Sequence, residues 1–306
     1  MGVSPAGLFK TERKKTEMKF VEPMLAHKAE ERGVKMGNDL YFAEPKIDGW
    51  RFQLHIVDRK AVALYSRKGN NSINASGAAW LRTRKWHRKV RDACLDLELY
   101  SGDGTNLAGP TAATALANGR VNIAVIDIME LNGHSLVRRT PWRERRDLLE
   151  EYFEDLAVPA TMDHKKLWKE WVTKRKGEGI LFKKKEGLYI PGLRSFSWLK
   201  HKVLDPYDVV ITGTTRKPTY SHEYSGGLAA LTFGFWDKKT RQLVTTGQGS
   251  NGLPRGTEEE LKQYVGRVAE LVCNGISSDG HMRHHRFKGK WRDDKKPQDC
   301  TICVKG

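Results

Sequence analysis

The chain of 306 residues is short of cysteine and has no long apolar run. Its four cysteines are irregularly spaced, at Cys94, Cys273, Cys300 and Cys303. This spacing excludes a disulfide framework and indicates reduced thiols in a reducing compartment. No segment approaches the ~18 apolar residues that a membrane span needs, and the N-terminal segment lacks the apolar core of a secretory signal. We therefore expect a soluble, cytoplasmic protein with no membrane partner.

Acidic residues are fewer than basic residues in this sequence. The sequence has 37 Asp and Glu against 54 Lys and Arg, which gives a net charge of +17 and a pI near 9.7. Residues 1–203 carry +13 of this charge. Such a surplus is typical of a protein that binds a polyanion, and it favours nucleic acid over an anionic membrane surface. Hydrophobic residues at 39%, including 9 tryptophans, exclude bulk disorder.

Apolar alternation predicts an antiparallel group of strands in the first part of the chain. A half-buried strand is expected within residues 40–57, with Gln53 and His55 on its polar side. Strands at residues 61–66 and 94–100 follow, and we expect the three to form a meander.

Helices and two further strands complete the prediction for this part. The apolar runs at residues 121–131 and 179–184 predict strands. Residues 77–92 predict a basic amphipathic helix. Thr140 is expected to cap a second helix, and a third is expected over residues 163–177. The predicted fold class for this part is therefore mixed α and β.

The pattern changes after residue 203. Short strands separated by Gly-rich turns predict a small β barrel over residues 204–306. Within it, Thr257 and Glu260 form the capping box of a helix that we expect to reach residue 272. The sequence thus predicts two domains, residues 1–203 and residues 204–306.

One lysine has the setting of a nucleophile. In the segment EPKIDGWR, residues 44–51, Lys46 precedes an Asp-Gly turn that exposes its amine. An amine attacks only when neutral, and neighbouring cations such as Arg51 disfavour its ammonium form. Lys46 is therefore a candidate nucleophile near neutral pH. An ordinary β-hairpin with Asp-Gly at its bend is the alternative for this segment.

Two downstream segments add carboxylate and ammonium groups. Glu178 precedes a predicted strand and Lys183 lies near its end. In RSFSWLKHK, residues 194–202, the amines of Lys200 and Lys202 lie two residues apart and share one face of a strand. Such a pair suits a phosphate chain. Solvated surface charge is the alternative for each segment, but their order along the chain argues against coincidence.

These ordered motifs resemble those of the covalent nucleotidyltransferase superfamily, and in detail those of small bacteriophage-type ATP-dependent DNA ligases. Lys46 matches the lysine that becomes adenylated in that family. Residues 23–26, PMLA, resemble the segment that precedes this lysine. The feature most specific to DNA ligases is the spacing of Arg194, Trp198, Lys200 and Lys202. Further matches are Ser66-Arg67, Asp96-Leu97-Glu98 with leucine in place of glycine, Glu178, Lys183, and Ile126, which takes the position of an aromatic residue that stacks on adenine.

The resemblance implies an α+β fold. An ATP-grasp-like nucleotidyltransferase domain, responsible for adenylation, would be followed by a C-terminal OB-fold β-barrel. The implied cofactors are ATP and Mg²⁺, with Glu98 and Glu178 as metal ligands. The residues implied in contact with ATP or AMP are Glu44, Lys46, Arg51, Arg67, Glu98, Ile126, Lys183, Arg194, Lys200 and Lys202. Lys183 is expected to face phosphate, and Arg292 and Lys295 of the barrel to orient the leaving pyrophosphate.

The resemblance also implies a reaction and a partner. Lys46 would be adenylated, AMP would pass to the 5′-phosphate of a nick, and the 3′-hydroxyl would displace AMP and seal the strand. The expected partner is nicked double-stranded DNA, bound by a monomer through backbone phosphates and with steep salt dependence. The implied setting is DNA replication, repair or recombination, in a phage-encoded enzyme that acts in the host cytoplasm.

Three other functions compete with this interpretation. An RNA ligase or a capping-type guanylyltransferase shares the lysine motif and the metal, whereas residues 23–26 and 194–202 favour a DNA ligase. A non-catalytic nucleic-acid-binding protein would need no nucleophile.

Cys300 and Cys303 have the local spacing of zinc ligands, but a second ligand pair at an established spacing is missing.

Overall fold

The protein folds into two units. The computed structural model describes residues 18–100, 102–104, 112–118, 121–203, 205–216, 229–238, 240–249, 252–273, 275–276 and 280–302. The first unit ends at His201 and the second begins at Lys202. Residues 1–17, which were expected to contain no signal core, lie outside the described residues, as does Cys303. No described helix is long and apolar enough to cross a membrane.

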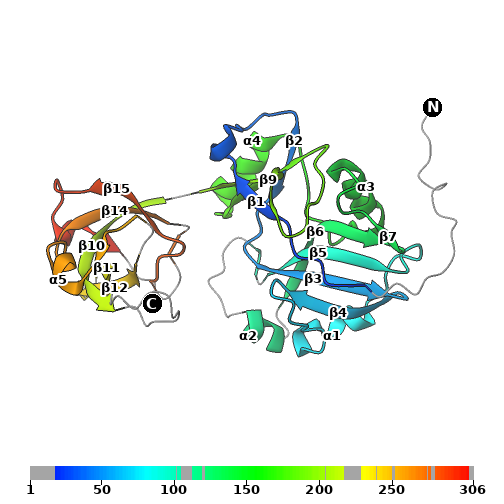
Figure 1. The fold of residues 1–306 in the computed structure, drawn as a ribbon, viewed down its shortest axis with the longest axis horizontal. Coiled ribbons are helices and arrows are strands. Elements are labelled where there is room, and N and C mark those ends of the chain that lie inside the picture. Colours follow the sequence, from blue (N-terminus) through cyan, green and yellow to red (C-terminus); the bar gives the residue numbers. More distant parts are fainter. Residues whose placement is uncertain are drawn as a thin grey trace. The chain divides into compact units, whose positions relative to one another are not determined.

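A five-stranded antiparallel sheet forms the centre of the first unit (Figure 1). In spatial order its strands are β4 (Lys60–Ser66), β3 (Trp50–Val57), β5 (Ala93–Tyr100), β6 (Asn122–Leu131) and β7 (His134–Ser135). The expected meander is therefore wrong, because β5 pairs with β3 and not with β4. Strand β3 is also buried on both faces rather than one. Gln53 is fully buried. Its side-chain oxygen accepts a hydrogen bond of 3.1 Å from the backbone N–H of Val21, which offsets the cost of burying this polar group.

A four-stranded mixed sheet packs beside it. Its strands, in order, are β1 (Leu25–Lys28), β9 (Arg194–Lys202), β8 (Gly179–Lys184) and β2 (Tyr41–Pro45). Strand β1 runs parallel to β9, and β2 runs antiparallel to β8. Because β2 and β3 belong to different sheets, residues 46–49 cross from one sheet to the other. The hairpin alternative for the lysine motif is therefore wrong.

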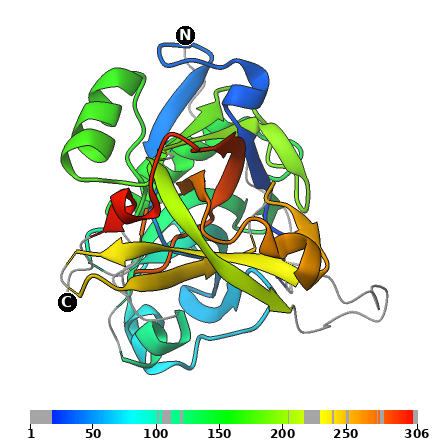
Figure 2. The ribbon, with the colours of Figure 1, turned by 90° about the vertical axis from the view of Figure 1, so that its left-hand side faces the viewer.

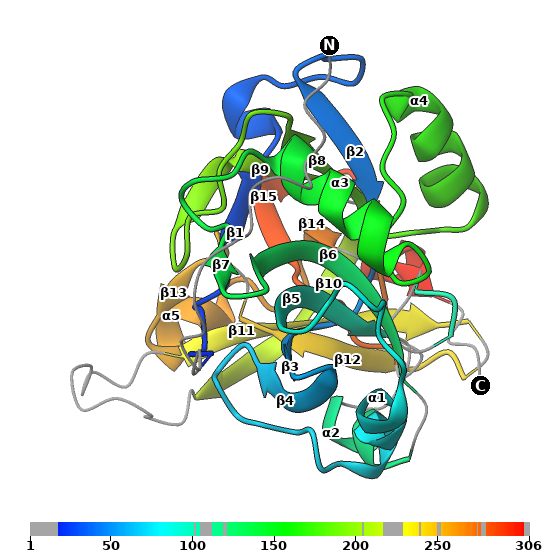
Figure 3. The same ribbon diagram turned by 90° about the vertical axis from the view of Figure 1, so that its right-hand side faces the viewer.

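The helices of the first unit are mostly short. They are η2 (Glu30–Arg32), η3 (Ser76–Ala78), α1 (Ala79–Thr83), α2 (Ala112–Ala117), α3 (Trp142–Phe153), α4 (His164–Leu167) and the π-helix η4 (Trp168–Lys174). The long α3 contacts β6 of the five-stranded sheet (Figure 3), and its Leu149 and Phe153 are buried in the main core.

Two helix predictions in this unit need correction. The helix expected over residues 77–92 ends at Thr83, because the following backbone bonds to neighbouring turns instead of to itself. Thr140 does not cap α3: Pro141 occupies the cap position and no side chain caps the helix. In contrast, Asp163 caps α4 as predicted, accepting a hydrogen bond of 2.9 Å from the Lys166 backbone.

The second unit is built from strands (Figure 2). They are β10 (Asp205–Arg216), β11 (Ala229–Asp237), β12 (Leu243–Gln248), β13 (Arg255–Gly256), β14 (Val268–Cys273), β15 (Arg286–Trp291) and β16 (Thr301–Ile302). The main path runs β12-β11-β10-β14-β15, and β13 and β16 also pair with β11. No pairing between the described residues of β12 and β15 closes this sheet.

Among the described residues of this unit, one short α-helix and a 3-10 turn accompany the strands. Helix α5 (Glu258–Lys262) has the predicted capping box of Thr257 and Glu260 and contacts β10 and β11; the turn is η5 (Pro297–Asp299). The expectation that this helix extends to residue 272 is wrong. Gly266, at φ 84°, breaks the helical path, and the valine-rich run after it forms β14.

Gly49 brings the crossover between the two sheets against β5. A Cβ at this position would lie 2.4 Å from the carbonyl oxygen of Leu99. We expect Gly49→Ala to lower the free energy of unfolding by about 1–3 kcal/mol, because the backbone of β5 has to move. Thermal and urea unfolding measure the change.

Gly213→Ala is the matched control. The nearest atom to a Cβ there is the hydroxyl of Thr232 at 3.4 Å, on a side chain that can turn. A loss for Gly49→Ala no larger than that for Gly213→Ala would contradict the close approach.

Candidate active site

The segment that carries Lys46 is pinned by backbone contacts from several elements. The N–H of Lys46 donates to the carbonyl of Gly179 at 3.0 Å, immediately after β2. The N–H of Asp48 donates to the carbonyl of Gly104, also at 3.0 Å. Together with the approach of Gly49 to β5, these contacts fix the lysine where the two sheets meet.

A cavity of about 100 Å³ lies beside this segment. Six of the residues predicted to contact the nucleotide line it: Glu44, Lys46, Arg51, Glu98, Ile126 and Lys200. They come from both sheets, from strands far apart in the sequence. Its wall also contains Ala26, Leu181 and Trp198, whose apolar surfaces suit a nucleotide base.

Lys46 is in direct contact with a carboxylate. Its Nζ donates a short hydrogen bond to Oε2 of Glu178, the residue before β8. The lysine side chain is 25% exposed and the glutamate side chain 8%. The predicted nucleophile therefore reaches the solvent side of the site while a nearly buried carboxylate holds its amine.

Arg51 is held by a buried network. Its Nε donates to Oδ1 of Asp96 at 2.8 Å, and its Nη2 donates to the second carboxylate oxygen. The hydroxyl of Tyr189 donates to the same carboxylate at 2.7 Å and accepts from the Met24 backbone at 3.1 Å. Burial opposes the guanidinium charge, but the charge of Asp96 more than offsets it and raises the pKa of Arg51. Arg51 is thus fixed as a cation in the cavity wall.

Glu98 is the carboxylate that burial perturbs most clearly. Burial raises the pKa of Glu98 to about 7, against the opposing charges of Lys46 and Arg51 and with support from Asp96 and Glu178. Its Oε2 is buried and accepts no hydrogen bond from the described part of the chain.

Two carboxylates near Lys46 fit a magnesium ion. Mg²⁺ keeps most of its waters and binds through one or two carboxylates together with substrate phosphate. Glu98, with its unpartnered buried oxygen, and Glu178 provide this donor set. The described residues contain no cluster of three or more acidic, His or Cys side chains, so they form no complete protein cage for a metal.

Lys183 lies outside the cavity wall. It is fully buried, 2.8 Å from Oε2 of Glu44, and it also donates to the carbonyl of Ile126. Burial raises the pKa of Glu44, although Lys183 and Arg146 oppose the change. The Lys183 amine is thus held by Glu44 and the Ile126 carbonyl and does not line the cavity, and its contact with phosphate stays a prediction.

Besides Lys183, three predicted nucleotide contacts do not line the cavity. Arg67 is exposed directly after β4. Arg194 is exposed at the start of β9 and donates to the carbonyl of Ala26. Lys202 lies two residues beyond Lys200 on β9 and is the first residue of the second unit.

Arg292 and Lys295 follow β15 in the second unit and share one carboxylate. Arg292 Nη1 lies 2.9 Å from Asp208 Oδ1, and Lys295 donates to the other oxygen. Arg292 also bonds Asp294 and holds the pKa of that carboxyl down to about 2. Arg292 and Lys295, the predicted basic pair, therefore lie close together in the second unit, where both contact Asp208.

The sequence pattern missed the supporting residues. Asp96 was part of a matched motif, but nothing in its spacing indicated Arg51 as its partner. Nothing singled out Tyr189. Asp127 next to Ile126 forms a fully buried ion pair with Arg145 of α3, with N–O distances of 2.7 and 2.8 Å. A charged residue inside an apolar strand was the available signal for this last pair.

Comparison with known proteins places these features in a family. Residues 23–202 match the family model described as ATP dependent DNA ligase domain. A DNA ligase of Thermoplasma volcanium is 27% identical, over 84% of this chain and 54% of its own length. DNA ligase 4 of Candida glabrata is 25% identical, over 86% of this chain and 30% of its own length. The chain therefore spans about a third to a half of these relatives.

A solved structure shows the same fold. A structure from an analysis of Lig E DNA ligases has a TM-score of 0.59 at 16% identity. The match covers 90% of this chain and 100% of that chain. At this identity the likeness concerns the fold alone.

Glu98→Gln is expected to stabilise the protein at pH 8 and to have little effect at pH 5. Because burial raises the pKa of Glu98 to about 7, the stability that its neutral form contributes is present below pH 4.5 and is lost as the pH rises through 7. Glutamine avoids this loss, which is on the order of 1–3 kcal/mol. Urea unfolding without Mg²⁺ or nucleotide measures it.

Glu154→Gln, at an exposed position of the same unit, is the control and should show no such pH dependence. An equal gain for Glu98→Gln at both pH values would contradict the raised pKa.

Asp96→Asn should destabilise the protein far more than Tyr189→Phe. The first change leaves the buried guanidinium of Arg51 without its counter-charge, a loss of about 3–5 kcal/mol. The second removes a neutral hydroxyl and its hydrogen bonds, at about 1 kcal/mol for each bond. Equal losses in urea unfolding would show that Asp96 is not the main partner of Arg51.

Proposed function

Because the chain belongs to the ATP-dependent DNA ligase family, we propose that it seals nicks in duplex DNA through a covalent lysyl-AMP on Lys46. The observation that carries this proposal is the contact of Lys46 with Glu178 at a cavity that also contains Glu98, Arg51 and Lys200. A protein that only binds nucleic acid does not require a lysine nucleophile held in place between carboxylates.

In the first step, Nζ of Lys46 attacks the α-phosphorus of ATP. The new P–N bond forms as the bond to pyrophosphate breaks, and the amine loses a proton. Oε2 of Glu178 already contacts Nζ and is in position to accept that proton. Arg51 and Lys200 stabilise the negative charge that spreads over the phosphate oxygens in the transition state.

Glu98 and Glu178 are the residues that would hold Mg²⁺ in this site. The ion would neutralise part of the charge on the phosphates when bound. Its binding requires the carboxylate form of Glu98, which is favoured above a pH of about 7. The remaining cavity wall, including Ile126 and Trp198, encloses the adenosine.

The later steps take place on DNA. AMP passes from Lys46 to the 5′-phosphate of the nick, and the 3′-hydroxyl then displaces AMP to form the phosphodiester bond. Arg67, Arg194 and Lys202 lie outside the cavity and are candidates for phosphates of the nicked strand. The +13 charge of residues 1–203 supports binding through the DNA backbone.

We assign the adenylation domain to residues 1–203 and an OB-fold to residues 204–306. The strand-built second unit, with its capped helix α5, supports the OB-fold assignment. Arg292 and Lys295 would orient pyrophosphate from this domain, after exchanging part of their contact with Asp208. We further propose that the protein acts as a monomer, and that it is encoded by a phage and works in the host cytoplasm.

An RNA ligase or a guanylyltransferase is the second candidate, because these enzymes share the lysine chemistry. The family match and the DNA ligases among the relatives support the DNA enzyme instead. Two assays, sealing of an all-RNA nick and label transfer from GTP, distinguish the RNA ligase and the guanylyltransferase from the DNA ligase.

Lys46→Ala should abolish both label transfer from α-labelled ATP and sealing of a nicked DNA duplex with ATP and Mg²⁺. It should retain some sealing of a nick that is already 5′-adenylated, because the last step uses no lysine nucleophile. This activity shows that the variant is folded. The assays are gel electrophoresis of labelled protein and labelled DNA.

Lys174→Ala is the matched control, since Lys174 is exposed on η4 and, within the described part of the chain, forms its ion pair with Glu170 of the same helix. It should behave as the native protein. Label transfer that persists in Lys46→Ala would overturn the assignment of the nucleophile, and sealing of RNA alone would overturn the substrate.

A further inference from the structure

A strongly basic segment lies outside the cavity. Residues 82–91 read RTRKWHRKVR, and most of their side chains are exposed. After α1 ends at Thr83, the segment is a loop held by two buried side chains, Trp86 and Val90. We define the basic patch as the exposed cations of this loop and the neighbouring β3–β4 turn: Arg59, Lys60, Lys85, Arg88, Lys89 and Arg91.

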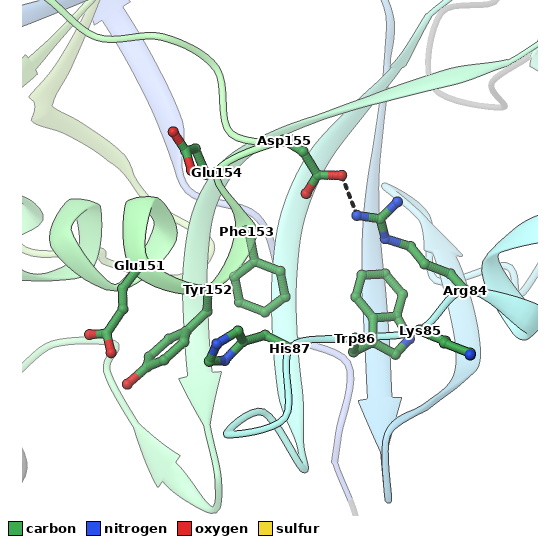
Figure 4. A pocket seen from close by; sticks show the side chains of 9 residues that line it. All are labelled: Arg84, Lys85, Trp86, His87, Glu151, Tyr152, Phe153, Glu154 and Asp155. Carbon is green, nitrogen blue, oxygen red and sulfur yellow. Dashed lines mark hydrogen bonds and ion pairs between the residues drawn. The ribbon is translucent and has the colours of Figure 1, made fainter.

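The end of α3 anchors the first half of the loop (Figure 4). The ring of Trp86 lies 6.2 Å from that of Phe153, and the ring of His87 lies 5.2 Å from that of Tyr152. Arg84 forms an ion pair with Asp155 across a hollow of about 260 Å³. These contacts fix the loop on the first unit.

Two turns of the five-stranded sheet anchor the second half. The N–H of Arg59 donates to the carbonyl of Arg91 at 2.8 Å. The side chain of Asn132 accepts from the N–H of Arg91 and donates to the carbonyl of Lys89, both at 2.8 Å. The backbone of the loop is therefore fixed at Lys89 and Arg91, next to the exposed cations. Holding them in place in advance reduces the ordering entropy of binding a polyanion.

Most of the patch has no counter-charge. Within the described residues, Arg59, Lys60, Lys85 and Arg88 have no carboxylate within 4.0 Å, whereas Lys89 pairs with Glu151 and Arg91 with Asp92. The exposed carboxylate of Asp58 lies at the margin, 4.0 Å from Arg91. Such a cluster of unpaired cations is typical of a surface that binds phosphates.

The patch lies at the opposite end of the five-stranded sheet from Lys46. Arg51 and Glu98 mark the cavity end, whereas Val57, Lys60 and Ala93 mark the patch end. From Trp50, next to Arg51, to Val57 is seven residue steps along β3, which at ~3.3 Å each give a separation of roughly 23 Å. At ~3.4 Å per base pair this length equals about seven base pairs of duplex.

We propose that the basic patch binds backbone phosphates of the duplex about seven base pairs from the nick. The inference rests on the proposed function, since it takes nicked DNA as the ligand. It assigns no base recognition to the patch, because contacts to backbone phosphates carry no sequence information. The patch would add affinity without taking part in the chemistry at Lys46.

The test is a double variant, Lys85→Gln/Arg88→Gln, which removes two unpaired cations without adding carboxylates. Binding is measured by fluorescence anisotropy with nicked DNA of 20 base pairs on each side, between 50 and 200 mM salt. Two lost phosphate contacts should weaken binding at low salt and reduce the slope of log K against log salt by about 1.8. The affinity deficit should accordingly shrink by about tenfold over this salt range.

A short nicked dumbbell with five base pairs on each side does not reach the patch, so native and variant proteins should bind it equally. Lys165→Gln/Lys169→Gln removes the same charge from exposed positions of α4 and η4 and should leave the slope for the long duplex unchanged. Label transfer from ATP should be native in both variants, which shows that they fold.

Several outcomes would overturn the inference. Unchanged affinity and slope for the long duplex, or equal weakening for the dumbbell and the long duplex, would show that the patch does not bind DNA at this distance. Weakening by the control pair of the same size would show a general charge effect. Each of these leaves the ligase activity intact, whereas absence of label transfer in the native protein would instead contradict the proposed function.

Discussion

The close approach of Gly49 to the backbone of Leu99 is the constraint on which the site depends. Residues 46–49 connect two sheets that share no strand, and the absent side chain lets this connection lie directly on β5. Lys46 from one sheet is thereby brought to Glu98 from the other. A bulkier residue would separate the nucleophile from the carboxylate without touching either of them.

The electrostatics of the site follow from the same junction. Three cations that the motifs indicated each have a carboxylate partner: Arg51 has Asp96, Lys183 has Glu44, and Lys46 has Glu178. These carboxylates are nearly or fully buried, so the cations are held in place before any nucleotide binds. Basic side chains of the first unit therefore lie both in buried ion pairs at the site and, in the basic patch, at exposed positions of which several have no carboxylate within 4.0 Å among the described residues.

Local patterns predicted local features well. The apolar run GILFKK predicts a strand with the bounds that β8 has, and Thr257 with Glu260 predicts the capping box of α5. Long-range contacts were beyond such patterns. The pairing of β3 with β5, the loop held by Asn132 and the burial of Lys183 all depend on residues at least 37 positions away. Motif resemblance located the site residues, but it did not distinguish those in the cavity wall from those beneath it.

The order of strands along the chain has a consequence for folding during synthesis. The five-stranded sheet uses residues 50–135, whereas β1 and β2 pair with β9 and β8, which are made last in the first unit. Contacts of such high sequence separation form late. A nascent chain that ends before residue 178 therefore already contains Lys46 but lacks Glu178, Trp198 and Lys200. An incomplete chain therefore carries Lys46 before the cavity around it can form.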